Sequence, residues 1–501
     1  MPRRSLLPLA ISLPRESSNS APLHRLIYSA IREAILSGQW REGTRLPSSR
    51  ELASELAVSR TTIVAAFDQL LAEGYVEGVA GSGTFIARVL PDDFVRSQQN
   101  NEDATRQRLV EGPKLSRRGY LIDGLQPFSG MPAEAFAPGR PDVSLFPFDL
   151  WARLHARIWR SPSVETLNAT DPLGYRPLRE ALAKYLIEVR ALRCDPSQVL
   201  IVSGAQQAYD LIGRVLLDPG DEVWYEEPGF PPGKAAYAAA GARIVPVSVD
   251  DNGLVVDEGR ALSAKARLAS VTPSHQYPLG SVMSLGRRRE LLGWAADANA
   301  WIVEDDYDGE FRYDGRPMAS LQGLDRERRV IYIGSFSKVL LPSIRLGFVV
   351  VPEHVVAAFG RARALVDQYP AMWQQPTMEM FISENYLASH IRRVRRIYKN
   401  RRDKFLQQRP YLDGLLDIEP NDTGIHLVAR LSHELSKVRK DTEIVNGLRL
   451  AGLHATALST LYFGPNVKQG LLLGYACVSE AAMETRVRQL ASALRAMMHE
   501  Q

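Results

Sequence analysis

A lysine flanked by hydroxyls and followed by an arginine is the segment best suited to covalent chemistry. Lys338 follows Ser335 and Ser337, and Arg345 lies seven residues further on. A lysine amine attacks an aldehyde when a desolvated pocket keeps the amine neutral. Two hydroxyls and a guanidinium suit a phosphate, which arginine can bind through two parallel hydrogen bonds. The segment predicts Lys338 as a Schiff-base lysine, with Ser335, Ser337 and Arg345 on a phosphate; a solvated lysine after a strand is the alternative.

Two other segments suit the same kind of ligand. Gly204, Ala205 and Gln206 stand between an apolar run and an expected helix, where small residues let backbone N–H groups approach a phosphate. Asp305 ends the run 301–303, and its carboxylate can hold a pyridine nitrogen protonated, which makes the ring an electron sink. Tyr307 can bond a phenolic oxygen on that ring. A plain strand-to-helix turn and an ordinary acidic strand end are the alternatives.

An aromatic residue completes the expected site. Phe230 follows Pro228-Gly229 and can stack on the face of a ring. A core phenylalanine is the alternative. No metal site is predicted.

The first 90 residues have a different pattern, typical of a small helical DNA-binding unit. An apolar stripe of Leu23, Leu26, Ile27, Ala30, Ile31 and Ile35 predicts a helix over 23–36. A second helix begins at Pro47-Ser48, where Ser48 and Glu51 have capping-box spacing, with Leu52, Leu56 and Val58 facing inward. A third begins at the N-cap Ser59 and buries Ile63, Phe67, Leu70 and Leu71. A hairpin around 78–83 follows, so we expect a winged helix; a docking module is the alternative.

The start of the third helix carries the residues expected to meet DNA. Arg60, Thr61 and Thr62 lie in its first turn, and no acidic residue stands between Glu55 and Asp68. Hydroxyls, an arginine and free N–H groups suit phosphates and base edges. Residues 20–90 hold seven arginines and seven acids. DNA affinity must therefore come from the local placement of charge.

Composition sets the broad class. The chain has 501 residues, 45% hydrophobic and 24% charged, with a formal net charge of +4, as in soluble proteins of two or three domains. Two cysteines, Cys194 and Cys477, favour a reducing compartment over a disulfide framework. No apolar run approaches the roughly 18 residues of a membrane span. The apolar start of the chain lacks a convincing cleavage site, so we expect a cytoplasmic protein without a membrane partner.

Apolar runs and polar stretches divide the chain. We expect a tail over 1–20, the winged helix over 21–88, a linker over 89–130 and an α/β domain over 131–501, whose smaller lobe spans about 395–501. Short apolar runs alternate with helical stretches in this domain, at 199–202, 222–225, 268–271, 301–303 and 330–333. Such runs are typical of a mainly parallel central sheet.

In the order and spacing of these segments, residues 131–501 resemble the fold-type-I aminotransferases. The stretches 171–179 (DPLGYRPLR) and 272–278 (TPSHQYP) add to the resemblance. It implies pyridoxal 5′-phosphate (PLP) as cofactor and a homodimer with its pockets at the subunit interface. It also implies that Tyr175 reaches the partner's phosphate, and that His275 or Gln276 makes the polar contact that an asparagine usually makes.

Residues 23–88 resemble the GntR-superfamily winged helix throughout. This resemblance implies DNA contacts by Arg50, Arg60, Thr61, Thr62 and the wing glycine Gly81. Joined to the aminotransferase-like part, the chain resembles MocR/GabR-type transcriptional regulators over about 21–501. Such a regulator is expected to bind paired DNA half-sites as a dimer and to sense a small amine or amino acid, or PLP itself.

The chain departs from the enzymes where Tyr277 stands in place of the usual asparagine and at a C-terminal arginine, and from a related regulator at a third place. Aminotransferases usually hold the substrate carboxylate with an arginine before a short apolar strand near the C-terminus, yet 470–476 (GLLLGYA) has none. Pro231-Pro232 stand where the GABA-responsive relative has a ligand-binding arginine. Because a buried carboxylate needs a partner, we expect PLP binding with at most partial transaminase chemistry. A genuine PLP-dependent aminotransferase with an appended DNA-binding domain is the alternative.

A basic stretch from Arg392 to Lys404 allows two interpretations. Apolar residues interleave with its arginines and lysines at helical spacing. The solvated face of a long helix is the first interpretation, and a supplementary contact with DNA or the linker is the second.

Overall fold

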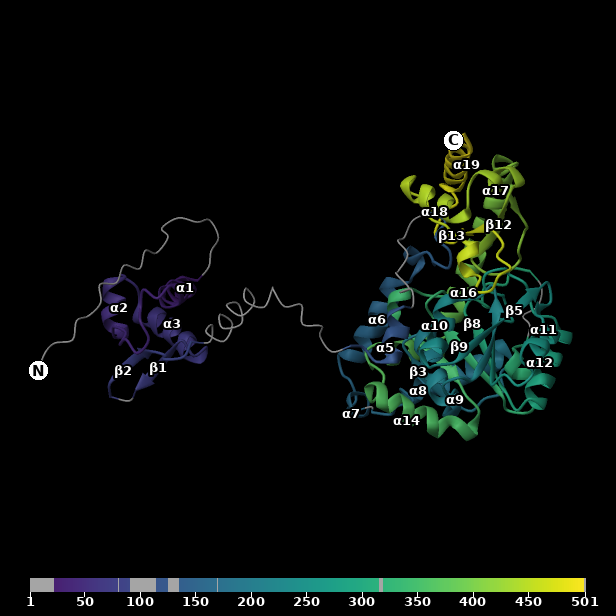
Figure 1. Ribbon diagram of the computed structural model, residues 1–501. Coiled ribbons are helices and arrows are strands. Elements are labelled where there is room, and N and C mark those ends of the chain that lie inside the picture. The colour runs from purple at the N-terminus through teal and green to yellow at the C-terminus, as the bar shows by residue number, and fades with distance from the viewer. Residues whose placement is uncertain are drawn as a thin grey trace, which may run out of the picture. The chain divides into compact units, whose positions relative to one another are not determined.

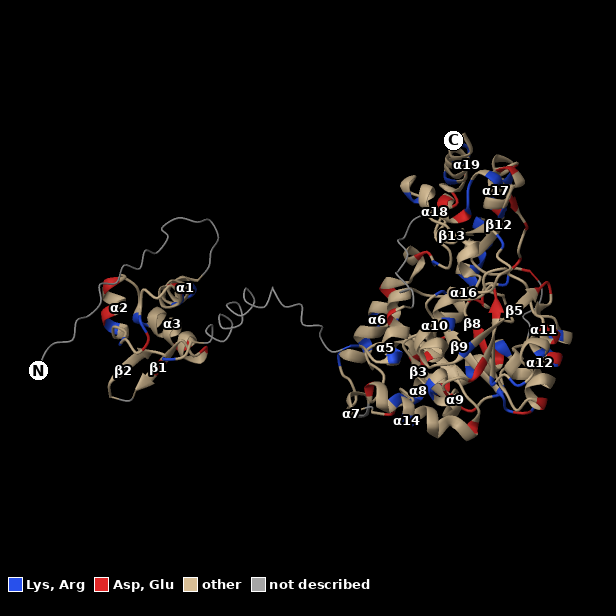
Figure 2. Cartoon of the chain, viewed as in Figure 1, with Lys and Arg blue, Asp and Glu red and all other residues tan. Residues whose placement is uncertain are grey.

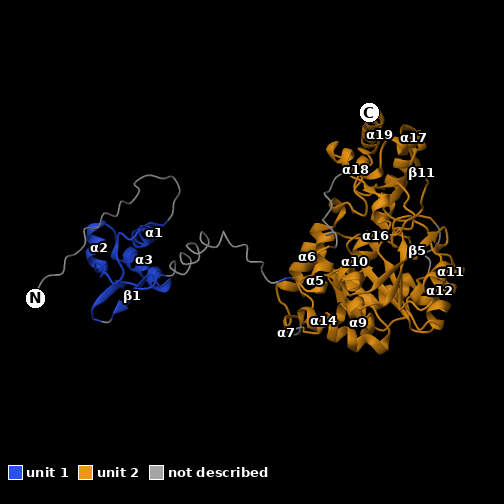
Figure 3. Ribbon diagram, in the orientation of Figure 1, with its two compact units in different colours: residues 1–114 blue, residues 115–501 orange. Residues whose placement is uncertain are grey.

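The computed structural model describes residues 22–79, 81–90, 114–124, 135–168, 170–314 and 319–499. The chain divides into two compact units, residues 1–114 and 115–501 (Figure 3). Each unit has its own hydrophobic core and is described by itself.

In its described residues, the first unit has three helices followed by a two-stranded hairpin (Figure 1). Its elements are α1 (Leu23–Leu36), α2 (Ser49–Glu55), α3 (Arg60–Ala72), β1 (Val76–Val79) and β2 (Gly83–Ile86). The strands pair antiparallel from Val76↔Ile86 to Val79↔Gly83. This arrangement confirms the predicted winged helix and its helix boundaries to within a residue or two.

The core of this unit corrects two of the expected buried positions. Ile27 and Ile31 of α1 pack with Ile63 and Leu70 of α3, all with no exposed surface. Leu71, predicted to be buried, is 50% exposed, and Leu23 is 44% exposed. The buried face of α3 runs through Ile63, Ala66 and Leu70, so Leu71 lies one position beyond it on the helix.

A large mixed sheet is the centre of the second unit. Within the described residues it has eight strands, in the order β3-β10-β9-β8-β7-β4-β5-β6. Their bounds are β3 (Val199–Val202), β4 (Glu222–Glu227), β5 (Arg243–Asp250), β6 (Gly253–Leu254), β7 (Leu268–Val271), β8 (Trp301–Asp306), β9 (Val330–Ser335) and β10 (Gly347–Val350). Neighbours from β5 through β4, β7 and β8 to β9 are parallel. The five predicted strands are all present; β10 was not predicted, and it pairs antiparallel with both β3 and β9.

Alternate residues of these strands supply the cores on the two faces of the sheet. Val202 and Ile333 pack with Ile212 of α9, whereas Ala269 and Ile302 pack with Leu291 and Trp294 of α12. The helices of this unit are α5 (Arg117–Asp123), α6 (Phe148–Trp159), α7 (Val164–Leu167), α8 (Arg176–Arg190), α9 (Ala205–Leu216), α10 (Pro231–Ala239), α11 (Val256–Leu262), α12 (Leu285–Asp297), α13 (Leu321–Leu324), α14 (Val356–Asp367), α15 (Gln375–Ser383), α16 (Tyr386–Gln407), α17 (His433–Val438), α18 (Asp441–Leu450) and α19 (Met483–His499). α5 lies inside the range expected to be linker.

A smaller antiparallel sheet forms the second lobe of this unit (Figure 1). Its order is β11-β12-β14-β13, with β11 (Leu416–Ile418), β12 (His426–Leu431), β13 (Thr456–Ala457) and β14 (Gly470–Gly474). Residues far earlier in the chain join this lobe, because Ala135 bridges to Leu453 and Phe136 to Gly474. The predicted α/β architecture with a smaller C-terminal lobe is therefore confirmed.

Candidate functional site

The carboxyl ends of the parallel strands bring the predicted ring-binding residues together, as is usual in α/β sheets. Asp305 lies near the end of β8 and is 4% exposed. Its Oδ2 accepts a 2.6 Å hydrogen bond from the Tyr209 hydroxyl of α9, and its Oδ1 has no hydrogen-bond partner among the described residues. Burial raises the pKa of the Asp305 carboxyl to about 7, against the Tyr209 hydrogen bond, which lowers it. A buried carboxyl with one unpaired oxygen suits a protonated ring nitrogen.

Lys338 lies just beyond the end of β9. Its Nζ donates to the carbonyl oxygen of Gly139 at 2.6 Å. Burial lowers the pKa of the Lys338 amine and nearby Arg140 acts in the same direction, whereas Asp308 and Asp305 raise it. Gly139 has a φ of +63°, and a Cβ there would lie 3.0 Å from Nζ. The lysine thus lies in a tight space that favours a neutral, nucleophilic amine.

His275 is buried in a hydrogen-bond network that fixes its tautomer. Asn421 Oδ1 accepts from the backbone N–H of Thr423 at 3.1 Å, so its Nδ2 must be the donor to His275 Nε2 at 2.9 Å. Nε2 is then an acceptor, and the ring proton is on Nδ1, which donates to Asp308 at 2.9 Å. Tyr307 lies 2.9 Å from the same Nδ1, where its oxygen can only accept. The Tyr307 proton is therefore left for another acceptor, as the expected contact with a phenolic oxygen requires.

The candidate phosphate-binding residues lie on the first turn of α9 and on the segment after β9. Gly204 is the N-cap of α9 with a φ of +131°, and a Cβ there would lie 3.7 Å from Arg345 Nη1. Ser337 N donates to Ser335 Oγ at 3.2 Å. The guanidinium of Arg345 has no hydrogen bond or ion pair with the described residues. Helix N–H groups, two hydroxyls and an uncommitted guanidinium at one place form a suitable anion site.

The remaining predicted residues lie at helix starts. Gln206 is exposed in the first turn of α9, and its side chain donates to Pro232 O at 3.0 Å rather than remaining free; Ala205 is the first residue of that helix. Phe230 is the N-cap of α10, with its ring centroid 5.5 Å from that of Tyr277. Tyr175 is the N-cap residue of α8.

These residues fit PLP. The unpaired carboxylate oxygen of Asp305 suits the ring nitrogen. The Lys338 amine, whose pKa is lowered by burial, suits the aldehyde. The anion site at Gly204, which has no Cβ, suits the phosphate. When bound, PLP supplies an aldehyde for amines and a ring that accepts electrons.

Several residues of the site were not found from the sequence. Tyr209, Gly139 and Asn421 contact predicted residues across 96 to 199 positions of chain. No local pattern marks them, because strand order and register bring them to the site. Asp308 was also missed, although it immediately follows the predicted Tyr307, and that position could have identified it.

We expect Tyr209→Phe to displace the ionisation of Asp305 to higher pH. The hydroxyl of Tyr209 stabilises the carboxylate and so lowers the pKa of Asp305. Without it, the effect of burial, which raises this pKa, meets less opposition. A hydrogen bond to a charged group contributes about 1.5 kcal/mol, which corresponds to about one pH unit. A pH titration of the Asp305 carboxyl signal by NMR, in the protein without PLP, measures this. Tyr237→Phe is the matched control, since Tyr237 packs edge-on against Tyr209 but makes no hydrogen bond to Asp305; equal shifts in both variants would contradict the assignment.

The region where aminotransferases usually place their carboxylate-binding arginine is apolar here. β14 is buried along its whole length. Leu472, at its centre, packs with Leu458 and Leu461, and Tyr277 and Leu279 lie against this cluster. A substrate carboxylate would find no cation from this strand.

The basic stretch of α16 is largely engaged within its own unit. Five of its side chains bond to other segments of the unit: Arg393 to Leu145 O, Arg395 to Glu310 O, Lys399 to Asp314, Arg401 to Asp142 and Arg402 to Asp422. These contacts hold α16 in its lobe and favour a structural role over DNA binding.

Charge reversal on α16 should therefore leave DNA binding unchanged. Arg392 and Arg396 are the exposed arginines of the stretch without contacts to other segments among the described residues. We expect Arg392→Glu/Arg396→Glu to alter neither operator affinity nor its dependence on salt concentration. Fluorescence anisotropy at several salt concentrations checks this, and a smaller salt slope would restore the DNA-contact interpretation.

In the first unit, two helix N-termini meet at the candidate DNA surface. Ser48 and Glu51 form the predicted capping box, and Ser59 Oγ accepts from Thr62 N at 3.1 Å. Arg60 Nε donates to Ser49 Oγ at 3.3 Å, which joins the first turns of α2 and α3.

The predicted DNA-contacting residues of this surface differ in exposure. Arg50, Arg60 and Thr61 are exposed, whereas Thr62 is half-buried with its hydroxyl 2.7 Å from the Ser59 cap. Gly81 lies between β1 and β2 with a φ of +76°. Both signs of charge occur on this unit (Figure 2), so these exposed groups, rather than net charge, must provide the affinity.

Comparison with known proteins agrees with both units. The family "Bacterial regulatory proteins, gntR family" matches residues 23–86, and "Aminotransferase class I and II" matches 148–490. The probable rhizopine catabolism regulatory protein MocR of Rhizobium meliloti is 39% identical over 95% of this chain and 94% of its own length. The chain belongs to the MocR/GabR-type transcriptional regulators. The pyridoxine biosynthesis transcriptional regulator PdxR of Corynebacterium glutamicum is 28% identical over 98% of this chain and 99% of its own length.

The aminotransferase-like unit also matches solved enzymes. The kynurenine aminotransferase of Pyrococcus horikoshii has a TM-score of 0.66 and 26% identity over 79% of this chain and 99% of its own. This MocR/GabR-type protein is thus a DNA-binding regulator with a fold-type-I aminotransferase-like unit, and its family and fold imply PLP binding. In the part of the chain that the structure describes, the helices are too short or too polar to cross a bilayer.

Proposed function

We propose that the protein carries PLP on Lys338 as part of a sensor for a small amine or amino acid, or for PLP itself. The observation that supports this most is the pairing of Lys338, held at 2.6 Å on Gly139 O, with a buried Asp305 whose second oxygen is unpaired. In this proposal Asp305 holds the ring nitrogen, while Tyr307 and Phe230 contact the ring. We assign the contacts with the phosphate to six residues: Gly204, Ala205, Gln206, Ser335, Ser337 and Arg345. His275 orients Tyr307 through Nδ1.

In this proposal, Lys338 and its neighbours have different roles. Burial lowers the pKa of the Lys338 amine, which favours its neutral, nucleophilic form. Asp308 accepts the hydrogen bond of His275 Nδ1–H, which holds the ring in one orientation. An amine effector can be recognised here, but the apolar cluster around Leu472 leaves its carboxylate without a strand cation. We therefore infer at most partial transaminase chemistry.

Exposed apolar side chains on α6, α14 and the segment before α15 support a homodimer. Trp373 is 63% exposed, Leu365 89% and Phe148 59%. Trp373 packs on Trp159 at 4.4 Å between ring centroids, which joins α6 to the segment before α15. A soluble protein rarely leaves such a surface open. We infer that a second copy covers it, that Tyr175 reaches the partner's phosphate, and that the pair sets the spacing of two DNA half-sites.

The alternative function is a genuine aminotransferase, favoured by the presence of both Lys338 and the buried Asp305. Two measurements on one preparation separate the functions. Footprinting on the region upstream of its own gene tests sequence-specific DNA binding, and amino-donor consumption with excess keto acid tests turnover. We expect a protected site and less than a few turnovers. Robust multiple turnover without specific DNA binding would establish the enzyme instead.

A further inference from the structure

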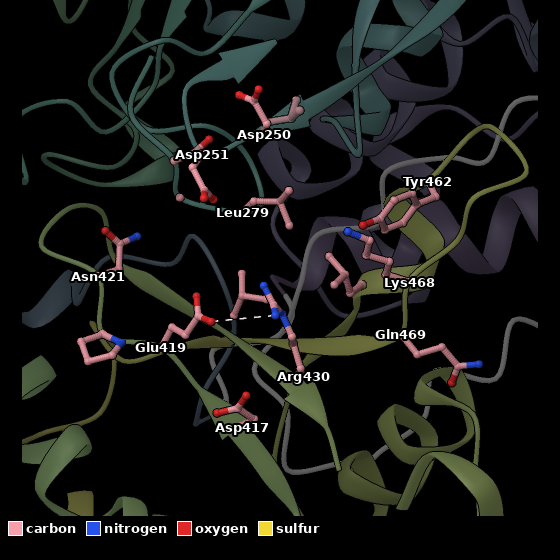
Figure 4. Close-up of a pocket in the computed structure, with 16 residues that line it drawn as sticks. Asp250, Asp251, Leu279, Asp417, Glu419, Asn421, Arg430, Tyr462, Lys468 and Gln469 are labelled. Carbon is pink, nitrogen blue, oxygen red and sulfur yellow. Dashed lines mark ion pairs between the residues drawn. The ribbon is translucent and has the colours of Figure 1, made fainter. Parts of the chain in front are cut away.

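A second cavity lies between the two lobes of the aminotransferase-like unit, apart from the residues assigned to PLP. It encloses about 510 Å³. Its large-lobe wall is the end of β5 and the loop Leu279–Ser281; its small-lobe wall comes from β11, β12 and the segment 458–469. Figure 4 shows the two walls facing each other. The cavity lies at the β5–β6 edge of the sheet, opposite the β3 edge, and its size suits a small ligand.

The walls of this interlobe cavity are fixed without a ligand. In the loop, Gln276 Oε1 accepts from Leu279 N at 2.9 Å and Gln276 O from Gly280 N at 2.7 Å. Asn421, on the opposite wall, is held by Thr423 and by His275. The cavity is therefore preorganised, which lowers the entropic cost of binding.

Opposite walls carry uncommitted charges of opposite sign. Asp251 of the large lobe and Lys468 of the small lobe are exposed, and neither has a hydrogen bond or ion pair with the described residues. Arg430 lies near Lys468 in Figure 4 and pairs only loosely with Glu419, at 3.8 Å. Asp250, by contrast, is already paired with Arg287 at 2.9 Å.

Apolar side chains and two further carboxyls complete the lining. Leu279, Val428 and Leu458 lie among the charged residues and suit the carbon chain of a ligand. Asp417 and Glu419 add acid on the small-lobe side, where Glu419 faces Arg430.

We propose that this interlobe cavity binds a small zwitterion, with its cationic group against Asp251 and its anionic group against Lys468 and Arg430. A ligand with only a positive charge would leave Lys468 without a counter-charge, and one with only a negative charge would leave Asp251 without one. A zwitterion contacts both walls at once, and these walls already lie in place without it. The site is independent of the proposed PLP function.

Titration calorimetry of the full-length protein with 4-trimethylammoniobutyrate tests the proposal. Its quaternary nitrogen cannot condense with an aldehyde, so binding reports a non-covalent site. We expect binding that weakens about tenfold in Asp251→Asn and about tenfold in Lys468→Gln. Asp218→Asn and Lys437→Gln, exposed residues of the same lobes outside the cavity, should bind as the unaltered protein does. Lys338→Ala should also retain binding.

Three results would overturn the zwitterion site. The first is no binding at millimolar concentrations. The second is equal binding of tetramethylammonium or butyrate, since a single charge would then suffice. The third is binding that is unaffected in Asp251→Asn and Lys468→Gln but lost in Lys338→Ala, which would place the ligand in the PLP pocket and leave the PLP function standing.

Discussion

Lys338→Ala should abolish covalent attachment of PLP. The amine of Lys338 is the lysine amine that the structure describes at the ends of β8 and β9, and burial lowers its pKa, which favours attack on an aldehyde. After borohydride reduction of the PLP-loaded protein, mass spectrometry should find the cofactor on the peptide containing Lys338, and on none in the variant.

A second lysine provides the control for this experiment. Lys234 on α10 is half-buried, and burial lowers its pKa as it does for Lys338. Lys234→Ala should retain the full covalent signal. If the cofactor were found on Lys234, or remained attached in Lys338→Ala, the assignment of Lys338 would be wrong.

Arg60→Ala should weaken operator binding about tenfold or more. Arg60 is exposed in the first turn of α3 and is aligned by its hydrogen bond to Ser49 Oγ. A direct base or phosphate contact of this kind contributes about 1–3 kcal/mol. Anisotropy titrations with the operator and with a scrambled duplex separate loss of specificity from loss of charge.

Arg25→Ala is the matched variant for Arg60→Ala. Arg25 is an exposed arginine of the same unit, on α1 rather than on the α2–α3 surface. The Arg25→Ala substitution removes the same charge as Arg60→Ala and should change operator affinity little. Equal losses in the two variants would mean that the unit binds DNA through diffuse charge alone.

Much of the molecule follows from local sequence patterns. The capping box of Ser48 and Glu51 and the five apolar strand runs each specify structure within a few residues, and these were predicted. Leu71 was misassigned because two adjacent leucines of α3 fit an apolar stripe, while packing against α1 selects only Leu70.

The rest depends on contacts between distant segments. Tyr209 reaches Asp305 across 96 residues, and Asn421 reaches His275 across 146. The order of the strands brings these residues into contact, and no residue type or spacing in the sequence predicts the contacts. The same applies to the 135–136 segment, which joins the small lobe through bridges to Leu453 and Gly474. The interlobe cavity likewise exists only because segments far apart in the chain, from residue 249 to residue 469, form its walls.

The central claim is that occupancy of the Lys338 pocket is transmitted to DNA. Operator affinity of the full-length protein, measured with and without PLP at one salt concentration, tests it most directly. The account predicts that PLP, alone or with an amine effector, changes that affinity at least severalfold, and that Lys338→Ala removes the change while it keeps specific binding. Equal affinities with and without PLP and every amine tested, in a protein shown to bind PLP on Lys338, would contradict it.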